Sequence, residues 1–197
     1  MAIDVKEARR EHLEYLSLFD YEVQRVMSTL VIPDWDSHPT RYATTLYGYM
    51  MSVFARFDLL SSLWRGSTDS RGQTRRIVDF LGNYLNIDWE IAVVAVHIWR
   101  HKLMHTSEPR RLRDPASGYQ YAWLLHWGFH LPKEQHFTMA RATGFGVLNL
   151  ALVYLIEDLR RATDGYFDEM QNTPTLQKLY QAAYGELQKP EVKWPKS

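Results

Sequence analysis

Hydrophobic side chains recur every three or four residues through most of the chain, which is the spacing of one face of an α-helix. The most apolar of these segments follows Asp88, a suitable N-cap, and is expected to run to about residue 105. Taken together, the pattern predicts helices over residues 4–30, 40–64, 74–84, 89–105, 144–168 and 175–187. We therefore expect an all-α fold, a helical bundle.

A second pattern interrupts the helical one between residues 110 and 140. Large side chains there alternate with other residues, which is the period of a β-strand; they are Tyr119, Tyr121, Trp123, Leu125 and Trp127. Residues 136–139 are expected to form the return strand after a turn over 131–134. The sequence thus predicts a small β-hairpin, around residues 119–139, inserted between the helices.

Chain length indicates a single domain. With 197 residues, of which 46% are hydrophobic, the chain can bury one core. We expect a helical domain over residues 1–188, with the hairpin insertion at about 110–140. Residues 189–197 follow the last predicted helix and are expected to form a flexible tail.

Charge and cysteine content narrow the classes of function. Lys plus Arg and Asp plus Glu number 23 each, so any nucleic-acid contact must come from a local basic patch. The absence of cysteine excludes disulfides, thiolate metal sites and cysteine nucleophiles. The longest apolar stretch, residues 145–156, is too short to span a membrane, and the charged first 14 residues are unlike a signal peptide. We expect a cytoplasmic protein without membrane contact.

Two residues near the end of the most apolar predicted helix suit the cleavage of RNA without a metal ion. His105 can accept the proton of a ribose 2′-hydroxyl, and Arg100 can bind the phosphate that this oxygen attacks. Five steps of an ideal α-helix rotate by about 140°, so these side chains would not share a face. Either the helix loosens near Met104, or two protomers share the site.

Residues 96–105 read Val-His-Ile-Trp-Arg-His-Lys-Leu-Met-His and resemble the Arg-polar-x(3–5)-His signature of the HEPN superfamily. The resemblance implies a helical-bundle, metal-independent endoribonuclease that needs no cofactor. It further implies that Arg100 and His105 are catalytic, with His101 in the polar position. The family is typically homodimeric and occurs in toxin–antitoxin and phage-defence systems, so RNA and an antitoxin-like protein are the expected partners. His101 departs from the more usual Asn or Asp, and many HEPN relatives are non-catalytic.

Basic residues flank this motif. Lys102, Arg110 and Arg111 are predicted to bind the phosphates of the substrate, and Arg113 lies beside them in the sequence. A second basic cluster is interpreted as an exposed helix start; it comprises Arg71, Arg75 and Arg76.

Two alternative functions stay open at this point. In the first, the protein is a non-catalytic HEPN-like interaction or nucleic-acid-binding module, in which Arg100 pairs with a carboxylate and His105 caps the helix. In the second, it is a metal-binding helical bundle that uses His97 and His101, which lie about 6 Å apart on one helix face. That site would need further ligands from other helices, such as His12, Asp20 or Glu22.

Overall fold

The computed structural model describes residues 3–29, 43–102, 110–126 and 131–189. Its α-helices are α1 (Val5–Thr29), α2 (Ala43–Arg65), α3 (Gln73–Leu85), α4 (Trp89–Ala95), α6 (Leu152–Gln171) and α7 (Pro174–Leu187). The helices predicted over 4–30, 40–64, 74–84 and 175–187 are confirmed, with their described ends shifted by at most one residue. The predicted tail, from residue 190 onward, lies outside the described residues.

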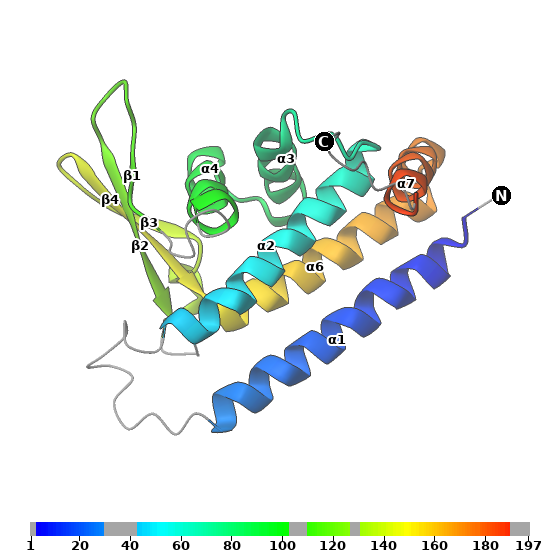
Figure 1. Ribbon diagram of the computed structural model, residues 1–197, viewed down its shortest axis with the longest axis horizontal. Helices are drawn as coiled ribbons and strands as arrows, with labels where there is room; N and C mark the ends of the chain where they lie inside the picture. Colours follow the sequence, from blue (N-terminus) through cyan, green and yellow to red (C-terminus); the bar gives the residue numbers. More distant parts are fainter. Residues whose placement is uncertain (1–2, 30–42, 103–109, 127–130, 190–197) are drawn as a thin grey trace, which may run out of the picture.

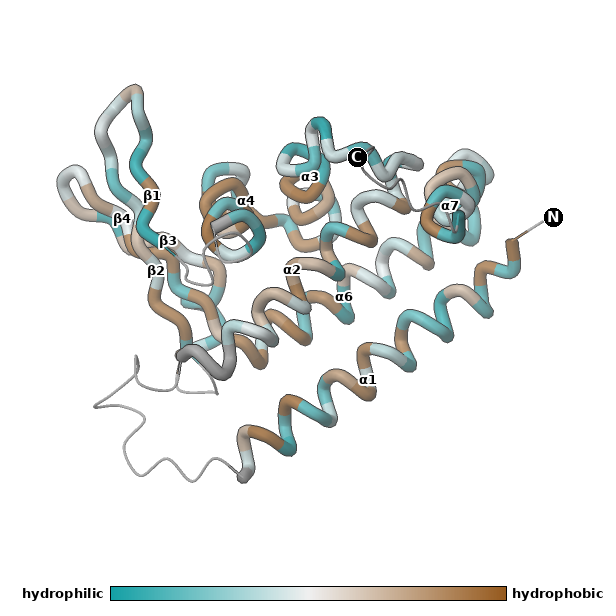
Figure 2. The backbone as a smooth tube through the Cα atoms, viewed as in Figure 1, coloured by the Kyte–Doolittle hydropathy of each residue, from teal (hydrophilic) through white to brown (hydrophobic). Residues whose placement is uncertain are grey.

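The long helices form the body of the molecule. α6 packs against both α1 and α2, α7 lies across one end of α2, and α3 stands between α2 and α4 (Figure 1). Their contact surfaces are rich in wholly buried aromatic rings, which include Phe54, Phe57, Phe80, Tyr166 and Phe167. Hydrophobic and hydrophilic segments alternate along α1, as expected for a helix with one buried face (Figure 2). None of the described helices is long and apolar enough to cross a bilayer.

A mixed β-sheet lies at the other end of the molecule. Its strands are β1 (Leu112–Arg113), β2 (Gln120–His126), β3 (Thr138–Ala142) and β4 (Phe145–Ala151), in the spatial order β1-β2-β4-β3. β2 and β4 run parallel, with Gln120 opposite Phe145, whereas β1 pairs antiparallel with β2 and β3 pairs antiparallel with β4. The prediction of an all-α bundle with a small hairpin is therefore wrong, because the fold is mixed α/β.

The error arose at β4, which lies inside the helix predicted over residues 144–168. A continuous apolar run is compatible with a buried helix and with a buried strand, so hydrophobicity alone could not separate them. In the structure Leu148 and Leu150 point into the core, whereas Val147 and Asn149 between them are half-exposed. Gly144, at φ 71°, provides the turn from β3 into β4. β4 therefore occupies the position beside β2 that the predicted hairpin had assigned to residues 136–139, but it runs parallel to β2, and α6 begins only at Leu152.

The sheet packs against the segment that carries Arg100. The ring of Trp99 is fully buried, with its centroid 5.1 Å from that of Trp123 on β2 and 6.0 Å from that of Tyr47 on α2. This aromatic contact joins α2, the sheet and the helical segment at one point. The predicted strand residue Trp127 lies outside the described residues.

Candidate functional site

The helix that carries the sequence motif changes its hydrogen-bonding pattern at Val96. The Asp88 carboxylate accepts hydrogen bonds from the Glu90 and Ile91 amides, at 2.9 and 3.3 Å, and so starts α4 as predicted. After Ala95 the helix continues as a π-helix, η1 (Val96–Lys102). π-Helices bond residue i to residue i+5 rather than to i+4, and such segments are frequent at functional sites.

Arg100 and His105 are also five positions apart in the sequence. The helix was predicted to loosen near Met104, whereas the π-helix that the structure describes covers residues 96–102. Met104 and His105 lie outside the described residues, so the placement of His105 beside Arg100 stays a prediction.

Arg100 is held by a carboxylate on α2. Its Nε and Nη2 atoms lie 3.2 and 3.0 Å from Oδ2 of Asp58, a residue 42 positions earlier in the chain. The two side chains are 19% and 13% exposed, so the ion pair lies just below the surface. A partly buried pair of this kind interacts more strongly than a surface salt bridge.

The same carboxylate also binds residues of α3. Nη2 of Arg76 lies 3.4 Å from its Oδ1 atom, and Nε2 of Gln73 donates a hydrogen bond to Oδ2. We call Asp58, Gln73, Arg76 and Arg100 the Asp58 cluster. The interpretation of Arg76 as part of an exposed helix start is wrong, since its side chain is only 8% exposed and its Nε atom has no partner among the described residues. Arg75, at 71%, is exposed as predicted.

The Asp58 cluster holds more positive than negative charge. Two guanidinium groups share one carboxylate, which leaves an excess of one positive charge in a partly buried place. The remaining Nη1 atom of Arg76 donates to the backbone carbonyl of Asp69, which carries no formal charge. Because a desolvated charge without a counter-charge is costly, such a cluster favours the binding of an anion. Guanidinium groups bind phosphate oxygens particularly well.

His101 lies beside this cluster. Its Nε2 atom is 2.7 Å from Oγ1 of Thr74, the residue that follows Gln73 at the start of α3. The ring of His101 also contacts that of His97, with 5.2 Å between their centroids. The fold thus brings Arg100 and His101 together, next to a hydroxyl group and an excess of positive charge.

The structure offers little for a metal ion here. Although His97 and His101 are close as predicted, no three His, Asp or Glu side chains gather suitably among the described residues. His12, one of the further ligands considered, packs its ring on Phe167 of α6 instead, at 5.3 Å between centroids.

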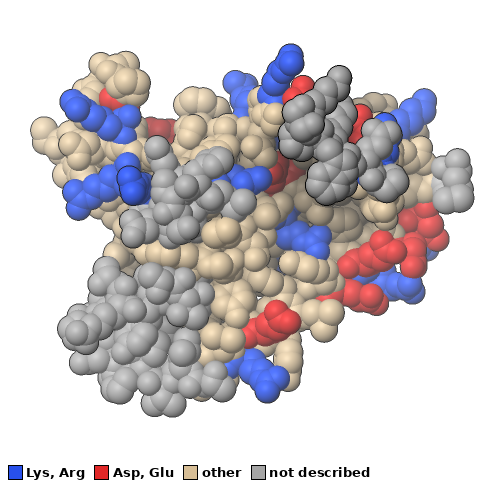
Figure 3. All heavy atoms as spheres, viewed as in Figure 1, with Lys and Arg blue, Asp and Glu red and all other residues tan. Residues whose placement is uncertain are grey.

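The predicted phosphate-binding residues lie along the approach to the sheet. Arg110 and Arg111 are exposed and lead into β1, and the guanidinium carbon of Arg111 is 5.9 Å from the centre of the Phe145 ring. Lys102 is the last residue of η1, and its side chain is outside the described part. On the face shown in Figure 3, Lys and Arg predominate over the sheet, whereas acidic groups gather at the opposite end.

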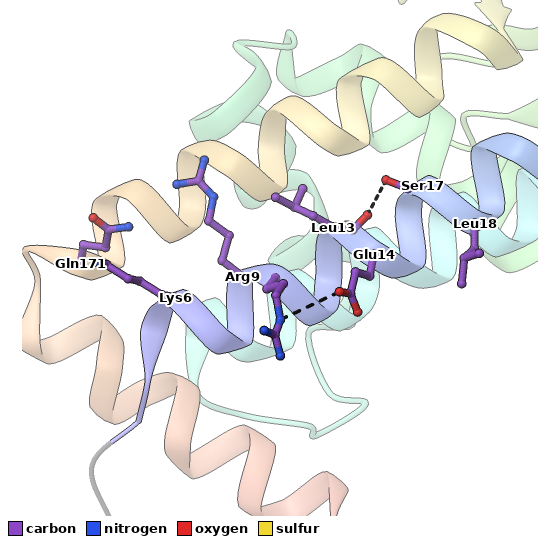
Figure 4. A pocket seen from close by; sticks show the side chains of 8 residues that line it. Lys6, Arg9, Leu13, Glu14, Ser17, Leu18 and Gln171 are labelled. Carbon is purple, nitrogen blue, oxygen red and sulfur yellow. Dashed lines mark hydrogen bonds and ion pairs between the residues drawn. The ribbon is translucent and has the colours of Figure 1, made fainter.

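A surface groove of about 800 Å³ runs along α1. Arg9 reaches from α1 towards α6 (Figure 4), where it pairs with Asp164 and Asp168. These bonds raise the pKa of Arg9, the Asp164 hydrogen bond most of all. Arg10 pairs with Glu7 and Glu14 on its own helix. Two of the three cations that line this groove, Arg9 and Arg10, are thus already paired. The third, Lys6, is exposed to solvent, so the groove lacks the partly buried excess charge of the Asp58 cluster.

No known family, curated protein or solved structure matches this chain. The function must therefore be argued from the residues themselves. Sequence reasoning missed Asp58, Gln73, Thr74 and Arg76, which complete the site around Arg100 and His101. One signal was present: Asp58 is a carboxylate between the apolar residues Phe57 and Leu59 of a core helix.

Proposed function

We propose that this protein is a metal-independent endoribonuclease of the HEPN type, with Arg100 binding and stabilising the scissile phosphate. In this proposal the ribose 2′-oxygen attacks the adjacent phosphorus, the bond to the 5′-oxygen of the next nucleotide breaks, and a 2′,3′-cyclic phosphate forms. A histidine accepts the 2′-hydroxyl proton, and a protonated group returns one to the leaving oxygen. His101 and His105 are the candidates for these steps. A homodimeric state and a toxin–antitoxin or phage-defence setting belong to the same proposal.

One observation carries the proposal: Arg76 and Arg100 share the single carboxylate of Asp58 beside the imidazole of His101. The excess positive charge provides electrostatic stabilisation where a phosphate gains negative charge in the transition state. Because Asp58 and Gln73 already hold the groups in place, little reorganisation is needed when the phosphate arrives.

A second function is favoured by a different detail of the same contact. Both Nε and Nη2 of Arg100 donate to Asp58, so this edge of the guanidinium, one of the two that can bind an anion with two bonds, is already occupied. In a non-catalytic nucleic-acid-binding or interaction module, Arg100 would have this structural role alone. Substitution of Arg100 would then leave RNA binding largely unchanged.

The deciding experiment is RNA cleavage by the purified protein in EDTA. Single-stranded, structured and transfer RNA would be incubated with wild type and with Arg100→Ala, His101→Ala and His105→Ala. We expect chelator-resistant cleavage with cyclic phosphate ends, reduced about 100-fold or more by Arg100→Ala and comparably by loss of the catalytic histidine. Arg100→Ala should remain folded, because Asp58 then faces one arginine and the cluster is neutral.

Arg75→Ala serves as the matched control. Arg75 is an exposed arginine of α3 that pairs with Asp79, so its loss removes the same charge near the site without touching the Asp58 cluster. Cleavage that survives all three site substitutions would argue for a contaminating nuclease. If wild type binds RNA but cleaves none of the three substrates, the binding-module function replaces the nuclease.

A further inference from the structure

A pocket of about 660 Å³ lies between α4 and the strands β1 and β2, at the end of the helix that leads to Arg100. Its walls are apolar and aromatic, with Val93 and Val94 of α4 facing Leu112, Pro115 and Tyr121 of the sheet. Trp89, at the start of α4, also lines the pocket and is 58% exposed. Pockets of this size and character typically bind small-molecule ligands.

The pocket is linked to the proposed phosphate site through one residue, His97. His97 lines the pocket, and the His97 ring contacts the ring of His101 one helical turn further on. Successive turns of an α-helix are separated by about 5.4 Å along its axis. A ligand seated between Trp89 and Tyr121 would therefore lie on the His97 side of the two histidines, with Arg100 and His101 further along η1.

The two carboxylates that line the pocket, Glu90 and Asp114, are bound to groups other than Arg113. Glu90 is fully engaged, since it accepts two hydrogen bonds from Arg141, at 2.7 and 3.1 Å, and one from the hydroxyl of Tyr121, at 3.0 Å. The Arg141 bonds lower the pKa of Glu90 and keep it ionised, so this pair is neutral overall. Asp114 is bound to the Ala116 and Ser117 amides of its own turn.

Arginine remains in excess on the sheet side of the pocket. Arg113 lines the pocket, and neither it nor the exposed Arg110 and Arg111 forms an ion pair within the part of the chain that the structure describes. These three side chains can bind the phosphates of a polyanion, and the aromatic side chains of the pocket can stack on a base.

We propose that this pocket binds one base of a single-stranded RNA, with Trp89 stacking on the base and Arg113 binding the phosphate of the same nucleotide. The pocket would then hold a nucleotide next to the one whose phosphate lies at Arg100. A base must be unstacked to enter, which favours single strands and loops over duplex RNA. This inference rests on the proposed function, and it defines the substrate class of that site.

Binding can be tested separately from cleavage with a fluorescein-labelled 2′-O-methyl RNA ten-mer, which has no free 2′-hydroxyl to attack. Fluorescence anisotropy would compare wild type with Trp89→Ala, Trp89→Phe and Arg113→Ala. We expect Trp89→Ala to weaken binding about tenfold and Trp89→Phe to retain most of it, because phenylalanine still stacks. Arg113→Ala should weaken binding and lower the salt-dependence slope by about one.

Two variants at the other end of the molecule provide matched controls. Arg10→Ala removes an exposed arginine from α1, and Tyr184→Ala removes a half-exposed aromatic ring from α7. Both should bind the ten-mer like wild type. A duplex of the same sequence should compete at least tenfold less well than the single strand.

The outcomes separate this inference from the proposed nuclease. If the ten-mer binds independently of Trp89 and Arg113 while cleavage of RNA requires Arg100, the pocket is not the base site and the nuclease stands. If binding depends on Trp89 and Arg113 but no RNA is cleaved, the pocket is confirmed and the nuclease fails. Equal competition by duplex would overturn the single-strand assignment.

Discussion

Two carboxylates lie in the interior of this protein, each with a cationic or imidazole partner on either side. Asp58 lies between Arg76 and Arg100. Asp158 of α6 lies between His136 and Arg161, with 3.1 Å from its Oδ2 atom to Nε2 of His136 and 2.7 Å from its Oδ1 atom to Nη2 of Arg161. Asp158 is buried, at 8% side-chain exposure, and Asp58 is partly buried, at 13%.

The two groups differ in their balance of charge. Nδ1 of His136 accepts a hydrogen bond from the Ala151 amide, at 3.0 Å, so the ring proton is on Nε2 and points at Asp158. The formal charges of a neutral imidazole, one arginine and one carboxylate add up to zero. The formal charges of the Asp58 cluster, with two arginines, do not. Asp158 therefore forms a charge-balanced structural contact between the sheet and α6. The Asp58 cluster, in contrast, leaves positive charge available for an anion.

The sharpest test of this difference is removal of the Asp58 carboxylate. Asp58→Ala leaves two nearly buried guanidinium groups side by side, and we expect it to lower the free energy of unfolding by about 4 kcal/mol. Urea denaturation followed by circular dichroism would measure the loss. Asp79→Ala is the matched control, since Asp79 also binds two arginines, Arg65 and Arg75, but at the surface, and should cost about 1 kcal/mol or less.

Repulsion between the two guanidinium groups can be isolated with a double variant. Asp58→Ala combined with Arg100→Ala has only one arginine in the cluster, so it should be more stable than Asp58→Ala alone. If the second substitution brings no recovery, the excess of charge is not what makes Asp58 necessary.

A third titratable group, His12, has no carboxylate partner of this kind among the described residues, and its burial makes the stability of the fold depend on pH. Burial, together with the nearby charge of Arg56, lowers the pKa of His12 from its ordinary 6.5 to about 4. Between these values the unfolded chain binds a proton that the folded protein does not. Stability is therefore lost as the pH falls from 6.5 to 4, by up to about 3 kcal/mol.

Comparison of wild type with His12→Gln would isolate that loss from the protonation of carboxylates. Unfolding free energies measured at several pH values should converge in acid, because the variant lacks the histidine contribution. Parallel curves for the two proteins would show that His12 is accessible to protons in the folded state.

The helical part of the fold could be predicted because its hydrophobic residues follow one local rule. α3 and α7 matched their expected bounds to within a residue, since burial of one helix face determines the spacing of apolar residues. β4 could not be predicted in the same way. Its pairing with β2 places Phe145 opposite Gln120, which is far away in the sequence. The local pattern of hydrophobic residues does not indicate which distant strand will be the partner.

The site was predictable only in part, for the same reason. Arg100 and His101 belong to one short motif, whereas the residues that define their chemistry come from other helices. Asp58 is 42 residues from Arg100, and Thr74 is 27 residues from His101. The charge of Arg76 was visible in the sequence, but its burial was not.

The smallest of these effects should come from the balanced group around Asp158. Asp158→Ala leaves the buried Nε2–H of His136 without an acceptor and frees Arg161, which is mostly exposed and can be hydrated. We expect a loss of about 2 kcal/mol in unfolding free energy, measured by urea denaturation. Asp158→Asn retains an oxygen that can accept from His136 and should cost less than the alanine variant. Neither substitution should alter RNA binding, because the group holds no excess charge; weaker binding by folded Asp158→Asn would mean that the two carboxylates do not have separate roles.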